Sequence, residues 1–310
     1  GEMKMKKFLA LILTLAMALS VTACGGSDDT ADDTADGEGS GTEETADYAS
    51  MTDDELKAAI TTVEGGKLTV ATSPDFAPYE FYALDENKEP QLAGFDMDLA
   101  QYIADYLGLE LEVVTVDFDG VISELQTKSV DLGMAGLSPD EKRMGIMDFS
   151  DLYYMGGQSL NVKDNAEKYN SFEAINKPDV SVGAQVGSIQ MDLANENSPE
   201  ADIVGLPKVT DIISELLTGK MDAAYIETDV AKSYQKNYPE LTLVMDVPYD
   251  AEGSAIGVCK GNEALLAGVN EAIAAAKEDG SLEKFIADAG ELAAGEKYEG
   301  LLDAEGNVQN

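Results

Sequence analysis

The chain has 310 residues, and its 60 acidic and 20 basic side chains give a formal net charge of -40. It contains no histidine and no tryptophan, and its two cysteines are Cys24 and Cys259. The lack of histidine excludes imidazole-based nucleophile relays and His-ligated metals, and two thiols cannot build a zinc-thiolate site or an iron–sulfur cluster. The negative charge disfavours nucleic acid, whose binding depends on Lys and Arg. We therefore expect an acidic binding protein, or an enzyme that works with carboxylates and lysine, with no cofactor and no metal.

The N-terminal residues have the pattern of a secreted lipoprotein. A basic segment at 4–7 precedes an apolar run at 8–19, which is too short to span a bilayer. The run is followed by Val-Thr-Ala-Cys, which ends at Cys24 and resembles a bacterial lipobox. We expect residues 1–23 to be a lipoprotein signal peptide and Cys24 to be lipidated. An ordinary secretory signal that happens to contain a cysteine is the alternative.

The next segment, 24–55, is expected to be an acidic, disordered tether. Between 27 and 46 it consists of Asp, Glu, Thr, Ala, Gly and Ser, and no basic residue occurs between Lys7 and Lys57. Such a composition buries too little apolar surface to offset the entropy of ordering the chain. A tether of this kind would hold a folded module away from a membrane.

Strand and helix patterns alternate through the remainder of the chain. The strands are expected at 67–72, 110–116, 130–135, 180–184, 203–206, 223–226, 241–245 and 254–259. The helices are expected at 95–107, 121–127, 139–146, 189–195, 211–218, 230–236, 263–278 and 282–289. The alternation starts afresh after Tyr154, and neither half contains a nucleotide-binding glycine motif. These patterns predict an α/β protein with mostly parallel sheets in two lobes.

Arg143 is the one arginine of the chain, among 19 lysines, and therefore a candidate for a task that lysine performs poorly. Two-pronged recognition of a carboxylate is such a task, whereas an incidental surface arginine is the alternative. Upstream, Ser138, Pro139 and Glu141 have the spacing of a capping box, with Ser138 as the N-cap. A helix that begins after a strand would offer free N–H groups to an anion beside this guanidinium.

Eight motifs follow one another between residues 67 and 289. They are ATSPDFAPYEF (71–81), GFDMDL (94–99), DFDGVI (117–122), LQTKSVDL (125–132), AGLSPDEKR (135–143), DFSDLYY (148–154), VGAQVGS (182–188) and GKMDAA (219–224). With this ordered set the chain resembles the solute-binding proteins of polar-amino-acid ABC importers, the bacterial extracellular solute-binding proteins of family 3. The resemblance is greatest to the glutamine-binding branch.

The resemblance implies a two-lobed periplasmic-binding-protein-like fold of type II, in which two hinge strands join two α/β lobes and the ligand lies in the cleft. By this analogy the chain crosses between lobes near 158–162 and near 244–248. Lobe 1 would comprise 65–160 plus 248–290, and lobe 2 would comprise 161–247. The segment 291–310 would be a C-terminal extension beyond the family pattern.

The resemblance also implies a set of ligand-binding residues. The carboxylate of an amino acid would be held by Arg143 and Ser138, with amide donors from Gly187, Ser188 and Ile189. Its ammonium would be held by the Gly136 carbonyl and Glu227. Phe76 and Phe118 would sandwich the ligand side chain. Asp75 and Gln185 would lie at or near positions that face this side chain, and Ser73 would belong to the same ligand-binding set. A zwitterion needs this division between donors and acceptors.

Several of these positions allow a second interpretation or depart from the family. Phe76 and Phe118 are also compatible with plain core packing, and Glu227 with a solvated acid at a helix start. Ser188 is also a plausible N-cap. Glu227 stands where the family usually has Asp, and Ser73 where Asp is often found. We interpret the pocket as one for a polar amino acid, neutral or cationic.

The resulting prediction is a lipid-anchored receptor on the extracellular face of the cytoplasmic membrane. It would bind an amino acid as a monomer and deliver it to the permease subunits of an ABC importer. The alternative is an enzyme on the same fold, similar to cyclohexadienyl or arogenate dehydratases, with Asp75, Glu80 and Glu227 as candidate acids or bases. A sensory module is a third reading.

Overall fold

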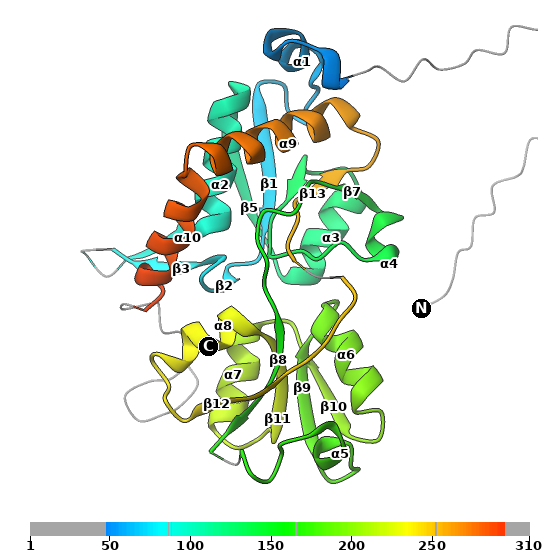
Figure 1. Ribbon diagram of the computed structural model, residues 1–310, viewed down its shortest axis with the longest axis vertical. Coiled ribbons are helices and arrows are strands. Elements are labelled where there is room, and N and C mark those ends of the chain that lie inside the picture. Colours follow the sequence, from blue (N-terminus) through cyan, green and yellow to red (C-terminus); the bar gives the residue numbers. More distant parts are fainter. Residues whose placement is uncertain (1–47, 86, 88, 165, 252, 295–310) are drawn as a thin grey trace, which may run out of the picture. The chain divides into compact units, whose positions relative to one another are not determined.

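The residues that the computed structural model describes belong to one compact unit, Ala46–Asn310, and are the following: 48–85, 87, 89–164, 166–251 and 253–294. Two five-stranded sheets with helices on both faces dominate this unit (Figure 1). The expected α/β class and two-lobed architecture are therefore confirmed. The predicted signal peptide, Cys24 and residues 24–47 of the predicted tether lie outside the described residues.

The first sheet is mixed, with a parallel half and an antiparallel half. From edge to edge its strands are β5 (Glu110–Thr115), β1 (Lys67–Thr72), β6 (Leu132–Gly133), β13 (Gly257–Cys259) and β7 (Met147–Phe149). β5, β1 and β6 are parallel, and β13 is antiparallel to both of its neighbours. β1 is buried along almost its whole length, as expected for a parallel strand that is covered on both faces.

Helices cover the two faces of this sheet because successive β1 side chains alternate between them. Leu68 and Val70 pack in the same cluster as the apolar residues of α2 (Phe95–Leu107) and α9 (Glu263–Glu278). Ala71 packs instead against α3 (Phe118–Gln126). Two further helices contact α9: α1 (Asp53–Ala59) and α10 (Ser281–Leu292).

The second sheet repeats this arrangement. Its strand order is β10 (Asp202–Leu206), β9 (Ser181–Gln185), β11 (Ala223–Glu227), β8 (Gln158–Lys163) and β12 (Leu241–Asp246). The first three are parallel, and β8 is antiparallel to both of its neighbours. Helices α7 (Val209–Leu217) and α8 (Thr228–Gln235) pack against β11, and α6 (Ile189–Asn197) contacts β9 and β11. A short helix, α5 (Phe172–Ile175), contributes Ile175 to a second hydrophobic cluster.

Two chain segments connect the sheets, one between β7 and β8 and one between β12 and β13. They pair with each other through an antiparallel bridge between Tyr154 and Ser254. β8 starts at Gln158 and β12 ends at Asp246. The expected crossover near 158–162 therefore lies within the second sheet, and the one near 244–248 overlaps the end of β12. The connections themselves lie at 150–157 and 247–256.

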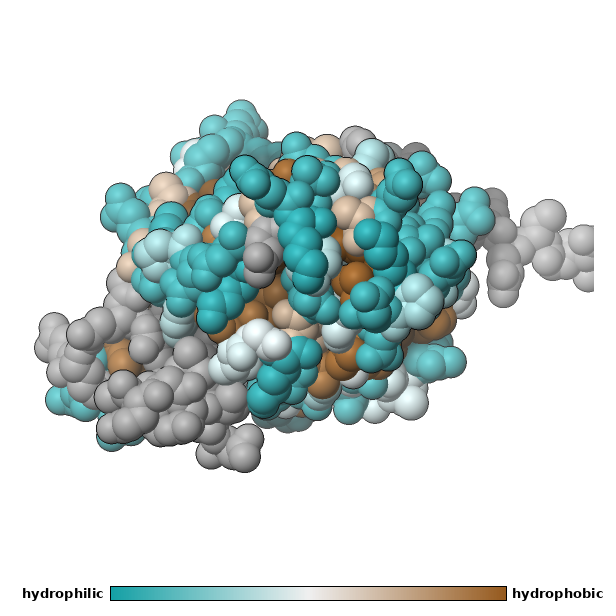
Figure 2. All heavy atoms as spheres, turned by 90° about the horizontal axis from the view of Figure 1, so that it is seen from below, coloured by the Kyte–Doolittle hydropathy of each residue, from teal (hydrophilic) through white to brown (hydrophobic). Residues whose placement is uncertain are grey.

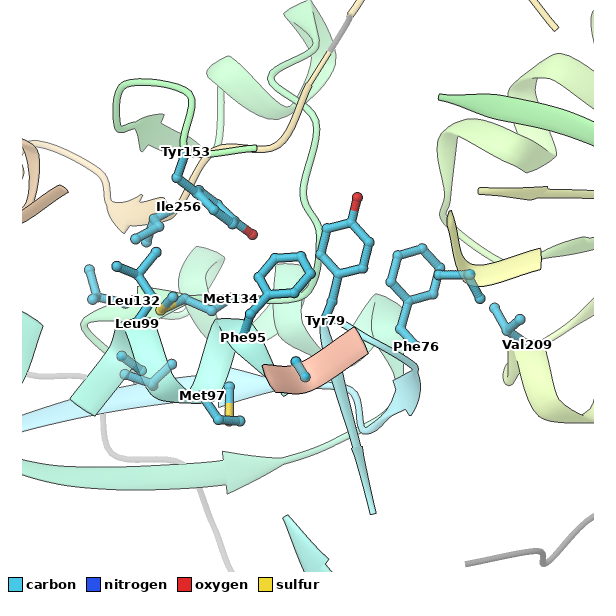
Figure 3. Close-up of a cluster of buried hydrophobic side chains, with 14 of the residues drawn as sticks. Phe76, Tyr79, Phe95, Met97, Leu99, Leu132, Met134, Tyr153, Val209 and Ile256 are labelled. Carbon is cyan, nitrogen blue, oxygen red and sulfur yellow. The ribbon is translucent and has the colours of Figure 1, made fainter. Parts of the chain in front are cut away.

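A third sheet, not expected from the sequence, consists of three short antiparallel strands: β2 (Asp75–Phe76), β3 (Glu80–Leu84) and β4 (Pro90–Ala93). β2 contacts α7 of the second lobe, and Figure 3 shows Phe76 of β2 reaching toward Val209 at the start of α7. This small sheet therefore brings the first lobe into direct contact with the second.

The ends of the described region differ from expectation. Tyr48–Ser50 forms a 3-10 helix and α1 begins at Asp53, although the predicted tether extends to residue 55. Thr52 and Glu55 form a capping box that starts α1, a local signal within the acidic sequence. α10 continues to Leu292, into the predicted extension 291–310.

The described surface is mainly polar. Figure 2 shows hydrophilic side chains over most of the described part of one face, with smaller hydrophobic areas between them. Among the described residues, no helix has the length and apolar character that crossing a membrane requires.

Candidate functional site

A pocket lies between the two lobes and collects most of the predicted site residues. From the first lobe it is lined by Phe76, Phe118, Gly136, Ser138 and Arg143, among others. From the second lobe it is lined by Gln185, Ile189 and Glu227. These side chains come from the ends of strands in both sheets and from the segments that follow them, the place where α/β folds bind ligands.

Arg143 lies at this pocket with its guanidinium held from three sides. Its Nη1 donates to the Ser138 carbonyl at 3.0 Å, and its Nη2 donates to the Gly187 carbonyl at 3.2 Å. Its Nε lies 3.1 Å from Asp140 Oδ2, and its carbon Cζ lies 5.4 Å from the centre of the Phe118 ring. Since each terminal nitrogen carries two hydrogens, one N–H on each remains for a ligand. Although 5% exposed, Arg143 is therefore poised to bind an anion.

The predicted capping role of Ser138 is wrong. Helix α4 comprises Glu141–Met144, and its N-cap is Asp140, whose side chain accepts from the Arg143 N–H at 2.8 Å. Asp140 is itself a strong N-cap residue, and it lies one position closer to the helix than Pro139. The carboxylate of Asp140 therefore occupies the start of the helix. An anion at this site would be held by the guanidinium rather than by the amides of α4.

Glu227 stands at a helix start, as its alternative interpretation has it, but it is buried rather than solvated. It is the N-cap of α8, where Oε2 accepts from the Val230 N–H at 2.8 Å, yet it is only 4% exposed and lines the pocket. Its Oε1 accepts from the Gly157 N–H at 3.2 Å and from the Tyr79 hydroxyl at 3.3 Å. Burial raises the pKa of Glu227 to about 7. A ligand cation would offset this cost of burying the carboxylate.

Gly156 makes room for this arrangement. A Cβ atom at position 156 would lie 2.5 Å from Glu227 Oε1 and 2.7 Å from the Tyr79 hydroxyl oxygen. Such distances are shorter than van der Waals contact, so a larger residue would displace Tyr79 or Glu227. A side chain at position 156 would therefore disturb the pocket wall.

Aromatic side chains form one wall of the site and extend into the core. The ring centres of Phe76 and Tyr79 are 5.2 Å apart, and those of Tyr79 and Phe95 are 4.5 Å apart. Figure 3 shows these three rings in a row. Phe76 and Phe118 are each 7% exposed and pack in hydrophobic clusters while also lining the pocket. Their core packing is therefore confirmed, and their contact with a ligand side chain stays a prediction.

Three predicted residues lie beside the pocket rather than on its wall. Ser73 donates to Asp75 Oδ1 at 2.8 Å. Gly187 offers its carbonyl to Arg143. Ser188 is the N-cap of α6: its hydroxyl accepts from the Met191 N–H at 3.2 Å and donates to the Gln185 carbonyl at 2.7 Å. Ser188 thus has the structural role that the sequence left as its alternative.

The sequence missed several residues of the pocket wall, including Tyr79, Gly156, Gln158, Gln190 and Tyr249. The Gln190 amide donates to Gln158 Oε1 at 2.8 Å, which joins α6 to the start of β8. For these missed residues, the one signal in the sequence was that Tyr79 belongs to the motif at 71–81. Glutamine is common on protein surfaces, so its presence in a pocket follows only from tertiary contacts.

Two buried acids lie behind the pocket. Asp96 is fully buried and accepts from the Tyr153 hydroxyl at 2.7 Å and from the Gly136 N–H at 3.2 Å. Glu80 is also fully buried, and neither of its oxygens has a hydrogen-bond partner among the described residues. Burial raises the pKa of Glu80 well above its ordinary value, with a further contribution from Asp96, and burial raises that of Asp96 to about 6. Within the described ranges no cluster of acidic or thiol side chains has the arrangement of a metal site.

Comparisons with known proteins agree on one family. The sequence profile of the bacterial extracellular solute-binding proteins, family 3, matches residues 68–288. The arginine-binding extracellular protein ArtP of Bacillus subtilis is 31% identical over 285 residues, covering 91% of this chain and 96% of that protein. The histidine-binding periplasmic protein of Escherichia coli is 28% identical over 230 residues, covering 70% of this chain and 85% of that protein.

Solved structures give the same result. The amino acid ABC transporter substrate-binding protein AbpA of Streptococcus pneumoniae, bound to L-arginine, superposes with a TM-score of 0.72 at 33% identity. The match covers 78% of this chain and 100% of AbpA. An ancestral amino acid-binding protein, described as a precursor of cyclohexadienyl dehydratase, superposes with a TM-score of 0.65 at 34% identity. This match covers 76% of this chain and 97% of the ancestral protein.

Proposed function

The chain belongs to the bacterial extracellular solute-binding proteins of family 3, and we propose that it is the substrate-binding component of an amino-acid ABC importer. In this proposal lobe 1 (65–160 plus 248–290) and lobe 2 (161–247) close on one amino acid. The observation that carries it is the pairing of a buried guanidinium, Arg143, with a buried carboxyl, Glu227, on the wall of one pocket.

The two charged groups define the head-group site. Arg143 has one N–H free on each terminal nitrogen for the ligand carboxylate, with Ser138 and Ile189 beside it on the pocket wall. Glu227 and the Gly136 carbonyl receive the ammonium. Since Arg143 belongs to lobe 1 and Glu227 to lobe 2, a zwitterion contacts both lobes and favours the closed form.

The cargo that this site suits is an arginine-like amino acid. ArtP is an arginine-binding protein by name, and AbpA was solved with L-arginine. The pocket walls contribute acceptors, and among the described residues its one charged donor is Arg143, which is committed to the carboxylate. A cationic or amide side chain therefore fits the charge of this site better than an acidic one.

A thermal-shift screen against the twenty amino acids tests this proposal. A ligand at 100 times its Kd adds about 2.7 kcal/mol to the unfolding free energy, which raises the melting midpoint measurably. We expect arginine, or another polar amino acid, to raise the midpoint. If no amino acid raises the melting midpoint of folded protein from which carried-over ligand has been removed, the proposal is wrong.

We further propose that the chain is lipid-anchored through Cys24 on the extracellular face of the cytoplasmic membrane, where it meets the permease subunits as a monomer. The support is the Val-Thr-Ala-Cys sequence and the acidic segment that follows it. Labelling of growing cells with a fatty acid should mark the wild type and not Cys24→Ala. Label on Cys24→Ala, or no label on the wild type, would count against the anchor.

A dehydratase is the second candidate function. One observation favours it: burial raises the pKa of Glu227, a pocket residue, to about 7, which suits a general acid or base at neutral pH. Asp75 and Glu80 are buried behind the pocket wall. Incubation with prephenate or arogenate decides between the two functions, since only an enzyme would form product at a useful rate, and Glu227→Gln should abolish that product.

A further inference from the structure

Glu80 is a fully buried acid to which the proposed function gives no role. It is the first residue of β3, and neither of its carboxyl oxygens receives a hydrogen bond from the residues that the structure describes. The Asp96 N–H donates to the Tyr79 carbonyl at 3.0 Å, which holds the first turn of α2 against the start of β3. Beside this bond the carboxyl groups of Glu80 and Asp96 interact directly in the core.

The surroundings of this acid pair do not support two negative charges. The charges that act on Glu80 come from other acids, Asp96 of α2 and Asp75 of β2. The strand on the other side of β3, β4, carries no ionisable side chain. Burial keeps the Tyr153 hydroxyl neutral, because it raises the pKa of that group well above its ordinary value. Since a buried carboxylate without a donor or a cation is costly, the pair holds a proton that one acid donates to the other.

The hydrogen bonds of the pair indicate which acid carries this proton. Asp96 Oδ1 accepts from the Tyr153 hydroxyl at 2.7 Å, and Oδ2 accepts from the Gly136 N–H at 3.2 Å. Glu80 accepts from neither. Donors stabilise the ionised form of a carboxyl group, so Asp96 is the carboxylate and Glu80 is the neutral acid. Each oxygen of Asp96 has a second lone pair for the bond from Glu80.

Asp96 connects the pocket to the segments that join the lobes. Gly136 lines the pocket with a φ of 57°, and a Cβ atom there would lie 2.8 Å from Phe76 Cε1. Tyr153 belongs to the first connection, and its N–H donates to the Ser254 carbonyl of the second connection at 2.9 Å. Asp96 therefore fixes the turn whose carbonyl would receive the ligand ammonium, and the point where the two connections meet.

We propose that Glu80 is a neutral acid that donates a hydrogen bond to ionised Asp96, and that this pair positions Gly136 and Tyr153 for ligand binding. Neither acid touches the ligand. Asp96 acts through Gly136, and Glu80 acts by holding the Asp96 carboxylate in place, so both are positioning residues. The binding part of this inference rests on the proposed function, because it supposes that an amino acid occupies the pocket.

The uptake of protons on folding tests the protonation of Glu80 without a ligand. In the unfolded chain a glutamate is ionised above about pH 5, so between about pH 6 and 8 a neutral Glu80 gives the folded protein one additional proton. The slope of the logarithm of the unfolding constant against pH, from urea unfolding, should therefore fall by about one in Glu80→Gln. Glu110→Gln is the matched control, because Glu110 is an exposed strand residue of the same lobe, in β5. It should leave the slope unchanged.

Calorimetry with the best amino acid of the thermal-shift screen tests the positioning role. In Glu80→Gln the amide N–H replaces the donated proton, so a hydrogen bond to Asp96 is retained. In Asp96→Asn the amide nitrogen cannot accept, so the Tyr153 hydroxyl or the Gly136 N–H loses its acceptor. The loss of affinity in Asp96→Asn should therefore exceed that in Glu80→Gln by about tenfold, the range of one hydrogen bond to a charged group.

Three results would overturn the inference. An unchanged slope in Glu80→Gln would show that Glu80 is ionised in the folded protein. A larger loss of affinity in Glu80→Gln than in Asp96→Asn would place the proton on Asp96. Failure of Glu80→Gln to fold would show that an amide cannot replace this acid.

If Asp96→Asn does not fold, the slope of Glu80→Gln decides alone. Because this slope is measured without ligand, its outcome is independent of the proposed function, which fails only if no amino acid binds.

Discussion

At the residue scale, Arg143 is the position where sequence and structure agree most closely. Because it is the one arginine of the chain, it was predicted to bind a carboxylate with two N–H groups. In the structure its guanidinium has three protein acceptors, and two N–H groups remain. Lysine could satisfy only part of this arrangement, because an ammonium has three donors and no planar fork.

Arg143→Lys should therefore weaken amino-acid binding by about 1.5–3 kcal/mol, or roughly 10- to 150-fold in Kd. Calorimetry with the best amino acid of the screen measures this loss. The neighbouring Lys142 is the control, because its side chain is 78% exposed and its ion pair with Asp192 across the cleft is solvated. Lys142→Ala should change the binding free energy by less than about 1 kcal/mol. Equal losses in the two variants would contradict the assigned role.

The raised pKa of Glu227 predicts that ligand affinity depends on pH. Burial raises its pKa to about 7 in the ligand-free protein, and a bound ammonium stabilises the ionised form. Affinity should therefore increase as the pH rises through about 7 and decline below it. The pKa values of Asp75 and Asp96 are lower, about 6, and Glu80 does not line the pocket. A change in affinity above pH 6.5 that is lost when Glu227 is replaced therefore comes from this carboxyl.

The matched variant is Glu227→Gln, which can still accept the Val230 N–H that caps α8. Its affinity should be lower at pH 8 and nearly independent of pH between about 6.5 and 8. A wild type with the same Kd at both pH values would show that the ammonium is not held by this carboxyl.

The site itself could be predicted only in part. Charged and aromatic residues were found through motifs, and eight of the predicted positions line the pocket. Gln158 and Gln190 were not predicted, because the role of an amide side chain depends on the partner that it contacts in the folded protein. Ser138 was assigned to the wrong task because Ser138 and Asp140 both fit the start of a helix, and local spacing does not choose between them.

At the element scale, helices with a clear apolar face were predicted well. The bounds expected for 95–107 and 263–278 are those of α2 and α9. Both signals are local: an apolar stripe, and for α2 a glycine, Gly108, in the left-handed conformation that ends it. The small sheet of β2, β3 and β4 was missed, because its short strands are stabilised by contacts with the rest of the fold.

The two ends of α2 allow a matched test of this reasoning. Gly94 precedes α2 with a φ of 126°, and a Cβ atom there would lie 2.0 Å from the Tyr79 carbonyl oxygen. Gly108 follows α2 with a φ of 73°, and a Cβ atom there would meet nothing within 4 Å. Gly94 thus has both a conformational and a steric requirement, whereas Gly108 has only the first.

Gly108→Ala should lower the unfolding free energy by about 1 kcal/mol, the cost of the left-handed conformation. Gly94→Ala should cost more than about 3 kcal/mol and also weaken binding, because it displaces the backbone of Tyr79 at the pocket. Denaturant unfolding measures both costs. Similar values for the two variants would contradict the steric argument.

At the scale of the whole molecule, the buried acids around the cleft make stability depend on pH. The pKa values of Asp75 and Asp96 are raised to about 6 and that of Glu227 to about 7, and that of Glu80 is raised further, mainly by burial. In the unfolded chain these carboxyls titrate near pH 4. Between pH 4 and the raised values the folded protein therefore binds more protons than the unfolded chain.

The folded protein therefore becomes less stable as the pH rises. The unfolding free energy of the ligand-free protein should be higher at pH 5.5 than at pH 8 by about 2 kcal/mol or more. Urea unfolding at high ionic strength, where the repulsion among the many surface acids is screened, isolates this contribution. Greater stability at pH 8 would contradict the protonation states proposed for the cleft.

The two lobes are linked by hydrogen bonds between residues on the pocket wall and beside it. Tyr79 with Glu227, Arg143 with Gly187, and Asp75 with Val209 are pairs that cross between them. The sequence could indicate two lobes from its two sets of strands and helices. It could not reveal these crossing contacts, because they depend on how the lobes close.

The central claim is that both lobes hold the head group of an α-amino acid, and one calorimetric comparison tests it most directly. The best amino acid of the screen is titrated beside its α-carboxamide, which keeps the ammonium and side chain but removes the charged carboxylate. Loss of the bond to Arg143 predicts a Kd weaker by about 10- to 100-fold for the amide. Equal affinity for the two ligands would show that Arg143 does not bind the carboxylate.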